Sequence, residues 1–354
     1  MNTKTMDIEA LIRPNIRKLK PYRSARQDYT SGILLDANEN AFGSAVTFDG
    51  LELNRYPDPS QRELRTKIAL LQKVETDNIF VGVGSDEVID LLIRIFCEPR
   101  TDSVLILEPT YGVYRVAADV NNVKVNSCLL ADDFQIDLNE VRQKMDASTK
   151  LIFCCSPNNP TGNLLRRDDI LALCATTSAI VVVDEAYFDF AQAESVISAV
   201  SLYPNLVVVR TLSKAWGLAA IRLGYAVADP LIVSYLMKAK APYNINILTS
   251  VEALKALDQT AHVEKSVAAT IAQRKRLIED LQRIGCVNAV FPSDSNCLLL
   301  RVTNAGVVHQ QLAQRGVIVR DRSAEPKLEN CIRISVGTPE QNDILLTALK
   351  ELIV

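Results

Sequence analysis

Short apolar runs that alternate with amphipathic segments constrain the fold of this chain most. Runs rich in valine, isoleucine and leucine predict strands at 78–83, 103–107, 123–128, 151–155, 179–183 and 206–209. Segments with helical spacing lie between several of them, at 85–97 and near 168–174. Strands that are apolar on both faces are buried on both faces, as in parallel sheets covered by helices. The sequence therefore predicts an α/β fold with a large domain built on a mostly parallel sheet.

The pattern changes after residue 242. An interrupted helical stretch is expected over 248–284, and Thr338, Pro339 and Gln341 predict the start of a last helix. Short strands are expected at 296–302, 317–320 and 331–335. This texture is typical of a smaller α+β domain. We predict three parts: an N-terminal segment that packs on the small domain or on a partner subunit, a large domain and a small C-terminal domain, at 1–45, 46–245 and 246–354.

The composition excludes several classes of protein. Hydrophobic residues make up 48% of the 354, and the net charge of −3 gives no reason to expect nucleic acid or an anionic membrane as a partner. Eight cysteines without a CxxC pair and only two histidines predict no metal site and no Ser-His-Asp triad. The chain lacks an apolar run of about 18 residues, and its N-terminal residues lack the apolar core of a signal peptide. A cytoplasmic protein is expected.

Two segments predict the start of a helix, and one of them also suggests a binding site. Ser60 and Glu63 have the spacing of a capping box. At 84–87, small residues join a predicted strand to a helix, so that free backbone N–H groups could bind a phosphate. Ser85 could equally be an ordinary helix cap. This segment lacks the last glycine of the GxGxxG dinucleotide motif.

Two ionisable residues follow predicted strands. Asp184 ends a buried run, and a carboxylate there either binds a ligand at the carboxyl edge of the sheet or forms a structural pair with an arginine. Lys214 follows another strand in an apolar neighbourhood, where loss of water would favour the neutral amine that forms a Schiff base. A surface lysine is the alternative. Ser213 and Arg222 favour the first interpretation, because they offer a hydroxyl and a cation to a phosphate.

A predicted turn adds a further candidate site residue, and the order of the motifs along the chain points to a family. The segment 156–162 is a turn by composition, and Asn159 within it could donate a hydrogen bond to a phenolate oxygen. In sequence order, the strings 159–162, 184–187 and 213–214, followed by Arg222, resemble the core of class I and II aminotransferases, which are fold type I pyridoxal-phosphate enzymes. The resemblance runs from about residue 13 to the C-terminus.

Further strings narrow the resemblance to the histidinol-phosphate aminotransferases. They lie at 21–22, 35–40, 55–59, 84–87, 109–112 and 333–338. Ala41 stands where that family usually has proline, and Ala220 where it usually has glycine. Both changes are small and lie near the chemical positions, not at them.

The resemblance implies a role for each site residue. Lys214 would form the Schiff base with pyridoxal 5′-phosphate and shuttle a proton in catalysis, and Asp184 would pair with the ring nitrogen. Asn159 and Tyr187 would hold the phenolic oxygen of the cofactor. The resemblance also implies that Tyr187 is a catalytic residue. Tyr111 would stack on the ring. The cofactor phosphate would contact the backbone of Ser85 and Asp86, the side chains of Ser213 and Arg222 and, from a neighbouring subunit, Tyr56.

The resemblance also implies substrates and partners. Arg333 would bind the anionic end of either substrate, because its planar fork suits carboxylate and phosphate alike. Arg320 could be a second cation or part of a structural ion pair, Tyr22 could contact the phosphate, and the stretch around Asn38 could cover an imidazole. The implied reaction is a ping-pong transamination in histidine biosynthesis, in which L-histidinol phosphate and 2-oxoglutarate give imidazole-acetol phosphate and glutamate. A homodimer that shares Tyr56 across its interface is implied as well.

Other functions of the same scaffold stay open. A phosphothreonine decarboxylase and an aromatic amino acid aminotransferase share much of the motif set. A regulator that binds pyridoxal phosphate is disfavoured, because only about 35 residues precede the motif at 36–40, too few for a DNA-binding domain.

Overall fold

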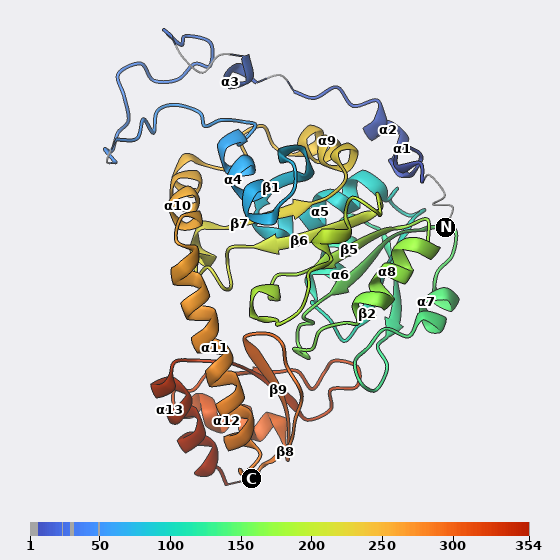
Figure 1. Ribbon diagram of the computed structural model, residues 1–354, viewed down its shortest axis with the longest axis vertical. Helices are drawn as coiled ribbons and strands as arrows, with labels where there is room; N and C mark the ends of the chain where they lie inside the picture. The colour runs from blue at the N-terminus through green and yellow to red at the C-terminus, as the bar shows by residue number, and fades with distance from the viewer. Residues whose placement is uncertain (1–5, 23, 29–31, 49, 354) are drawn as a thin grey trace.

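A seven-stranded sheet forms the centre of the larger of two bodies (Figure 1). The computed structural model describes residues 6–22, 24–28, 32–48 and 50–353. The strand order is β1-β7-β6-β5-β4-β2-β3, in which β6, β5, β4, β2 and β3 run parallel and β7 is antiparallel to both neighbours. The predicted mostly parallel sheet is confirmed. Its strands are β1 (Ile79–Val83), β2 (Ser103–Glu108), β3 (Lys124–Leu129), β4 (Thr149–Cys155), β5 (Ile180–Asp184), β6 (Leu206–Thr211) and β7 (Leu223–Val227).

Helices cover both faces of this sheet. Successive strand residues point to opposite sides, and because both sets are apolar, both faces must be buried. In β5, Val181 and Val183 belong to one apolar core, whereas Ile180 and Val182 belong to the other. The first core includes side chains of α4 (Arg62–Gln72), α7 (Leu138–Lys144), α8 (Arg167–Thr176) and α10 (Ile247–Leu257). The second includes side chains of α1 (Ile8–Leu11), α5 (Gly84–Phe96), α6 (Val113–Val120) and α9 (Pro230–Ala239).

A four-stranded antiparallel sheet forms the smaller body, in the order β10-β11-β9-β8. These strands are β8 (Val287–Val290), β9 (Cys297–Val302), β10 (Arg320–Asp321) and β11 (Cys331–Ser335). A third apolar core joins β8, β9 and β11 to α11 (Thr260–Leu281), α12 (Ala305–Gln314) and α13 (Pro339–Lys350). The predicted cap of α13 is confirmed, because the side chains of Thr338 and Gln341 each accept from the other's backbone N–H. The boundaries predicted at residues 45 and 245 stay predictions.

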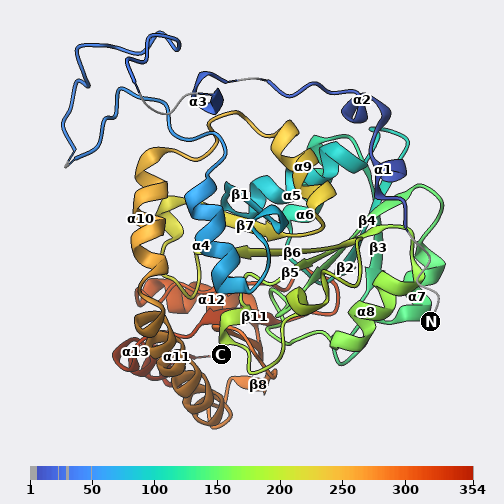
Figure 2. The same cartoon turned by 45° about the horizontal axis from the view of Figure 1, so that its top comes forward.

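The N-terminal segment begins on the large body. Ile8 and Ile12 pack into its second core, and Arg13 forms a 2.9 Å ion pair with Glu98. Residues 8–13 therefore contact the large body, and the packing of the segment on the small domain or a partner subunit stays a prediction. After α2 (Pro14–Arg17) and α3 (Ala25–Asp28), the chain over 32–48 stands away from both bodies (Figures 1 and 2). It carries exposed apolar side chains at Ile33, Leu35, Phe42, Val46 and Phe48.

One local prediction is confirmed with different bounds, and another was wrong. The strand predicted at 317–320 is observed as β10, which consists of Arg320 and Asp321 and pairs with Arg333 and Ile332 of β11. The capping box predicted at Ser60 does not form. Helix α4 begins at Arg62, whose backbone N–H donates to Asp58 at 2.9 Å, and Asp58 also accepts from Ser60. Single helical turns lie at Thr76–Asn78, Phe188–Phe190, Val196–Ala199 and Ala219–Ile221.

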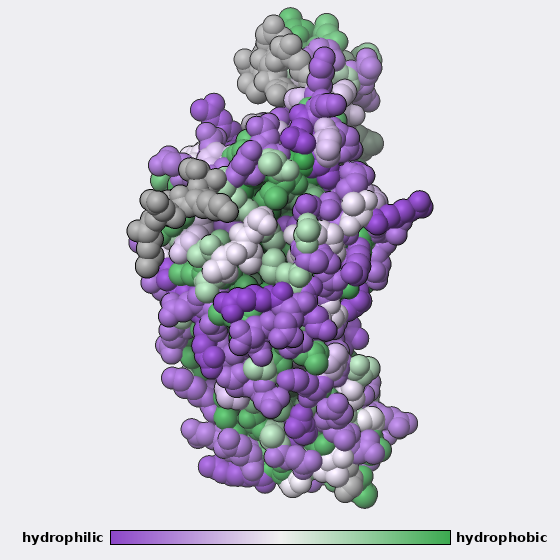
Figure 3. Space-filling model, turned by 90° about the vertical axis from the view of Figure 1, so that its right-hand side faces the viewer, coloured by the Kyte–Doolittle hydropathy of each residue, from purple (hydrophilic) through white to green (hydrophobic). Residues whose placement is uncertain are grey.

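Hydrophilic residues cover most of the face drawn in Figure 3, and hydrophobic residues are scattered between them. Within the described ranges, no helix combines the length and the apolar character that crossing a membrane requires.

Candidate active site

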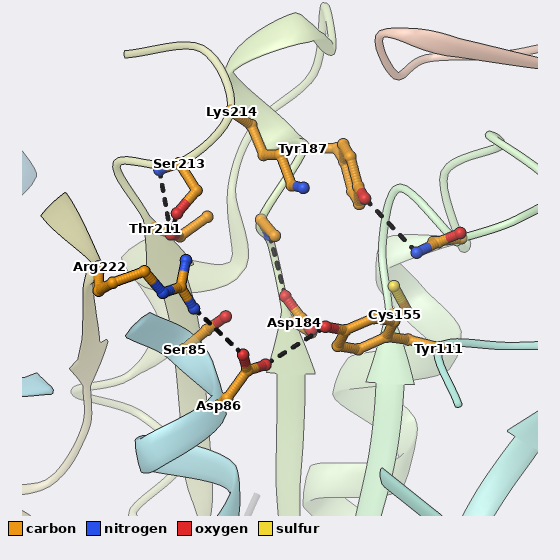
Figure 4. Close-up of a pocket in the computed structure, with 12 residues that line it drawn as sticks. Ser85, Asp86, Tyr111, Cys155, Asp184, Tyr187, Thr211, Ser213, Lys214 and Arg222 are labelled. Atoms are coloured by element: carbon orange, nitrogen blue, oxygen red, sulfur yellow. Dashed lines mark hydrogen bonds and ion pairs between the residues drawn. The ribbon is translucent and has the colours of Figure 1, made fainter. Parts of the chain in front are cut away.

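A cavity lies where the carboxyl ends of β2, β4, β5 and β6 meet the first turn of α5 (Figure 4). This is the edge of an open α/β sheet at which ligands bind. Every cofactor-binding residue predicted from the sequence lines it, with the exception of Tyr56. The lining residues are Ser85, Asp86, Tyr111, Cys155, Asn159, Asp184, Ala186, Tyr187, Thr211, Ser213, Lys214 and Arg222.

Asp184 is the buried anion of the cavity. It is the last residue of β5 and is 3% exposed. One carboxylate oxygen accepts from the Tyr114 hydroxyl at 2.7 Å, and the other accepts from the backbone N–H of Ala186 at 3.0 Å. Burial raises the pKa of Asp184 to about 6, and the hydrogen bond from Tyr114 opposes that rise. Among the described residues no arginine pairs with it, so the structural Arg–Asp pair is not what forms.

Lys214 extends from the loop after β6 toward Asp184 and Tyr187 (Figure 4). Its Nζ lies 5.3 Å from the centre of the Tyr187 ring. The predicted desolvation is wrong, because Lys214 is exposed. The apolar neighbours that suggested burial, Trp216 and Leu218, pack against the core under the sheet rather than around the amine.

One end of the cavity is suited to a phosphate. Ser85 lies in the first turn of α5, no side chain caps the helix at its N-cap Val83, and the backbone N–H groups of that turn carry the positive end of the helix dipole. The interpretation of Ser85 as an ordinary cap is therefore wrong. Arg222 reaches this turn from the start of β7 and lies 3.4 Å from Asp86, an ion pair with both partners about half exposed. Ser213 lies beside it in the cavity lining.

Two glycines make this close approach possible. Gly84 has a φ of +73°, and a Cβ atom there would lie 2.8 Å from the Arg222 guanidinium. A Cβ atom on Gly224 of β7 would lie 2.3 Å from the backbone nitrogen of Ser85. Side chains at either position would push Arg222 or β7 away from the end of α5.

Amide and phenol groups line the opposite side. The Asn159 amide lies 3.4 Å from the Tyr187 hydroxyl, and its oxygen accepts from Arg333 of β11 at 2.5 Å. Arg333 thus brings the small body to the edge of the cavity. Burial raises the pKa of Tyr187, and it raises the pKa of Tyr111 to about 12. Both phenols therefore stay protonated at neutral pH and can donate hydrogen bonds.

Four residues predicted for the site lie elsewhere in the chain described. Tyr56 stacks on Tyr243 with ring centres 4.4 Å apart, and Tyr22 lines a separate hollow with Lys240. Arg320 is exposed and lies opposite Arg333 in the β10–β11 register. Asn38 is exposed, with a φ of +54°. Their roles stay predictions.

Sequence reasoning missed four residues at or beside the cavity. Cys155 and Thr211 end β4 and β6, so the rule that ligands bind at strand ends could have found them. Burial raises the pKa of the Cys155 thiol, which keeps it protonated. Ala186 contributes a backbone N–H. Tyr114 lies one helical turn after Tyr111, but nothing in the sequence indicated that it would reach Asp184.

A family comparison agrees with this geometry. The model of the family described as aminotransferase class I and II matches residues 30–349. The chain belongs to this family.

Within this family, the chain is similar to individual proteins of known name. Over 345 residues it is 46% identical to the histidinol-phosphate aminotransferase of Cytophaga hutchinsonii, covering 97% of this chain and 98% of that protein. The crystal structure of the histidinol-phosphate aminotransferase from Clostridium acetobutylicum superposes with a TM-score of 0.78 at 26% identity, covering 84% and 90% of the two chains. The L-threonine-O-3-phosphate decarboxylase of Porphyromonas gingivalis gives a TM-score of 0.73 at 26% identity, covering 84% and 90%.

The cavity of this aminotransferase fits pyridoxal phosphate. Ser85, Asp86 and Arg222 at one end of the lining offer backbone N–H groups and a guanidinium to an anion, and the buried Asp184 lines the same cavity. A protonated ring nitrogen would supply the cation that a buried carboxylate needs. Lys214 lines the same cavity and would supply the amine that condenses with an aldehyde.

Proposed function

We propose that this aminotransferase uses pyridoxal phosphate to transfer the amino group of L-histidinol phosphate to 2-oxoglutarate, giving imidazole-acetol phosphate and glutamate in histidine biosynthesis. The convergence of Lys214, the buried Asp184 and the Arg222 anion site in one cavity carries the chemistry. The 46% identity to a protein named histidinol-phosphate aminotransferase supports the choice of substrate.

Pyridoxal phosphate, when bound, supplies an aldehyde and an electron-withdrawing ring. Arg222, Ser213 and the amides of Ser85 and Asp86 would hold its phosphate. Lys214 would accept the proton from the substrate α-carbon as a general base. It would then deliver a proton to C4′ of the cofactor as a general acid. Asp184 would keep a proton on the ring nitrogen.

The amide and phenol groups would orient the cofactor ring. The Tyr187 hydroxyl and the Asn159 amide both face the cavity and would donate to its phenolic oxygen. Tyr111 lines the same cavity from the end of β2 and would cover the ring face. Because burial keeps both phenols protonated, their donation persists across the neutral pH range.

The substrate anion would be bound by Arg333. A guanidinium fork accepts a carboxylate or a phosphate, and the reaction alternates between substrates that carry these groups. Asn159 holds this guanidinium at the cavity edge through its amide oxygen. Arg320 lies opposite Arg333 on the neighbouring strand and would add a second cation. Tyr22 and Asn38 would reach the substrate as part of the N-terminal segment.

We also propose a homodimer in which Tyr56 completes the phosphate site of the other copy. In its own chain Tyr56 stacks on Tyr243, is half exposed and lies outside the cavity lining. The neighbouring segment over 32–48 exposes several large apolar side chains, of which Phe42 and Ile33 are almost entirely accessible. Apolar surface of this kind favours burial against another protein surface.

A direct assay tests the substrate. Purified protein with pyridoxal phosphate, histidinol phosphate and 2-oxoglutarate is expected to form glutamate, and omission of histidinol phosphate should abolish it. Phosphothreonine is the matched comparison, because the similarity to the decarboxylase of Porphyromonas gingivalis makes decarboxylation the second candidate. Release of carbon dioxide from phosphothreonine without glutamate formation would contradict the transaminase. Phenylalanine as amino donor tests the aromatic aminotransferase in the same way.

A further inference from the structure

The carboxylate of Asp184 has one side-chain partner within hydrogen-bonding distance among the described residues. That partner is Tyr114 of α6, whose hydroxyl donates at 2.7 Å. The other oxygen accepts from the backbone of Ala186, which any residue at that position would supply except proline. Tyr114 is fully buried, so no water competes for its hydroxyl.

Aromatic packing fixes the direction of this hydroxyl. The Tyr114 ring stacks on Phe153 of β4, with centres 4.8 Å apart and planes 8° apart. Tyr111 packs edge-on at 5.6 Å. Because two neighbouring rings hold the Tyr114 ring in place, its hydroxyl already points toward Asp184. The hydrogen bond therefore costs no further conformational entropy of this side chain. Burial raises the pKa of Tyr114, so it remains a donor throughout the working pH range.

A buried carboxyl that lacks donors takes up a proton. A protonated Asp184 could not hold a proton on a ring nitrogen, since it would no longer be an anion. The other ionisable groups that affect Asp184 do not compensate: Asp86 opposes its ionisation, while Lys214 favours it more weakly than Tyr114 does. The remaining ionisable groups that interact with it are Tyr111, Cys155 and Tyr187.

We propose that Tyr114 is a positioning residue that keeps Asp184 ionised and oriented, so that Asp184 can hold the proton on the ring nitrogen of the cofactor. This inference rests on the proposed use of pyridoxal phosphate. Tyr114 touches neither cofactor nor substrate in this role, because it acts only through the carboxylate.

Tyr114→Phe tests the proposal, because phenylalanine keeps the stacked ring and removes only the hydroxyl. Tyr225→Phe is the matched control: Tyr225 is also buried, and its hydroxyl accepts from Gln72, outside the residues that line the cavity. In protein without cofactor, the ¹³C carboxyl signal of Asp184, assigned by its loss in Asp184→Asn, should titrate near pH 6 in the parent. In Tyr114→Phe its midpoint should rise by about one pH unit, the effect of losing one hydrogen bond to a charged group. Tyr225→Phe should titrate like the parent.

Cofactor affinity gives a second readout. Because the upward shift leaves fewer ionised carboxylates at low pH, Tyr114→Phe should bind pyridoxal phosphate about fivefold more weakly at pH 6 and less than about twofold more weakly at pH 8. An analogue with a C–H group in place of the ring nitrogen should bind parent and variant equally. In an Asp184→Asn background, the Tyr114 substitution should have no further effect.

An unchanged Asp184 titration in Tyr114→Phe would overturn the inference. Equal loss of affinity for pyridoxal phosphate and for the C–H analogue would overturn it too, since that pattern indicates a structural effect. Failure of the parent chain to bind pyridoxal phosphate would instead contradict the proposed function, and the titration would still measure what Tyr114 does to Asp184.

Discussion

Asp184 and Lys214 line the same cavity but differ in burial, and this difference decides what controls the charge of one and the reactivity of the other. Asp184 is buried, and its charge state depends on two hydrogen bonds. Lys214 is exposed to the cavity, so its reactivity depends on what enters the cavity rather than on the apolar residues next to it in sequence. The sequence located both residues correctly at strand ends. It could not give the exposure of Lys214, because the direction in which Trp216 and Leu218 pack is decided by distant parts of the chain.

Replacing Lys214 should abolish covalent attachment of the cofactor. Reduction with borohydride followed by denaturation should leave pyridoxal phosphate on the parent chain and none on Lys214→Ala, as measured by mass spectrometry. The variant should still bind the cofactor non-covalently, because the phosphate site and Asp184 remain. Lys238→Ala serves as the control, since Lys238 packs over Tyr235 outside the cavity. Retention of cofactor by Lys214→Ala after denaturation would show that another lysine carries it.

Arg333 should matter mainly for substrate binding. Arg333→Lys keeps the charge but loses the two-pronged donation and the contact with Asn159, so KM for both substrates should rise about tenfold or more. Cofactor affinity should stay within about twofold, because Arg333 is not among the residues that line the cofactor cavity. Steady-state kinetics and cofactor titration separate the two effects. Weaker cofactor binding with an unchanged KM would contradict this assignment.

At the scale of elements, strand ends were more predictable than strand partners. The apolar runs of β1 to β6 are long enough to identify from composition, and the site residues follow at their ends. Strand β7 was not predicted, because Gly224 interrupts its apolar pattern. A glycine is needed there because a side chain would collide with the backbone of Ser85 in α5. Over 317–319 the side chains do alternate, with Ile318 exposed and Val319 buried, but no strand in the described part of the chain pairs with these residues. Pairing is a tertiary property that a local pattern does not contain.

Gly84 supplies a test of the junction between β1 and α5. Gly84→Ala should cost about 1–2 kcal/mol of stability from its positive φ, and its Cβ should also displace Arg222. Gly217→Ala is the matched control, because Gly217 has a φ of +68° and no atom of the described residues lies within 4 Å of an added Cβ. Both variants should lose similar stability in urea unfolding. Only Gly84→Ala should bind pyridoxal phosphate more weakly, by about tenfold, and equal affinities would contradict the role given to this glycine.

At the scale of the whole molecule, the site draws on both bodies. Most of its residues follow strands of the large sheet, whereas Arg333 comes from the small one. Tyr22, Asn38 and Tyr56 do not line the cavity of their own chain in the part of it that is described. In the proposed homodimer their placement would depend on contacts between copies, which local sequence patterns do not specify.

Mixing two inactive variants should restore activity if Tyr56 acts across a dimer interface. Lys214→Ala and Tyr56→Ala should each be nearly inactive alone. A mixed dimer has one site with both residues intact, so exchanging subunits under mild denaturation and refolding should recover up to about a quarter of the parent activity. Lys214→Ala mixed with Asp184→Asn is the control and should recover none, because the two residues lie in the same cavity. No recovery with Tyr56→Ala would place Tyr56 outside the partner's site.

If Tyr56, which stacks on Tyr243 outside the cavity of its own chain, completes the phosphate site of a second copy as proposed, activity depends on dilution. A phosphate site that borrows a tyrosine from a second copy is complete only in associated protein, so association and cofactor retention become linked equilibria. Specific activity should therefore fall when the enzyme is diluted below the dissociation constant of the dimer, and added pyridoxal phosphate should move that threshold to lower protein concentrations.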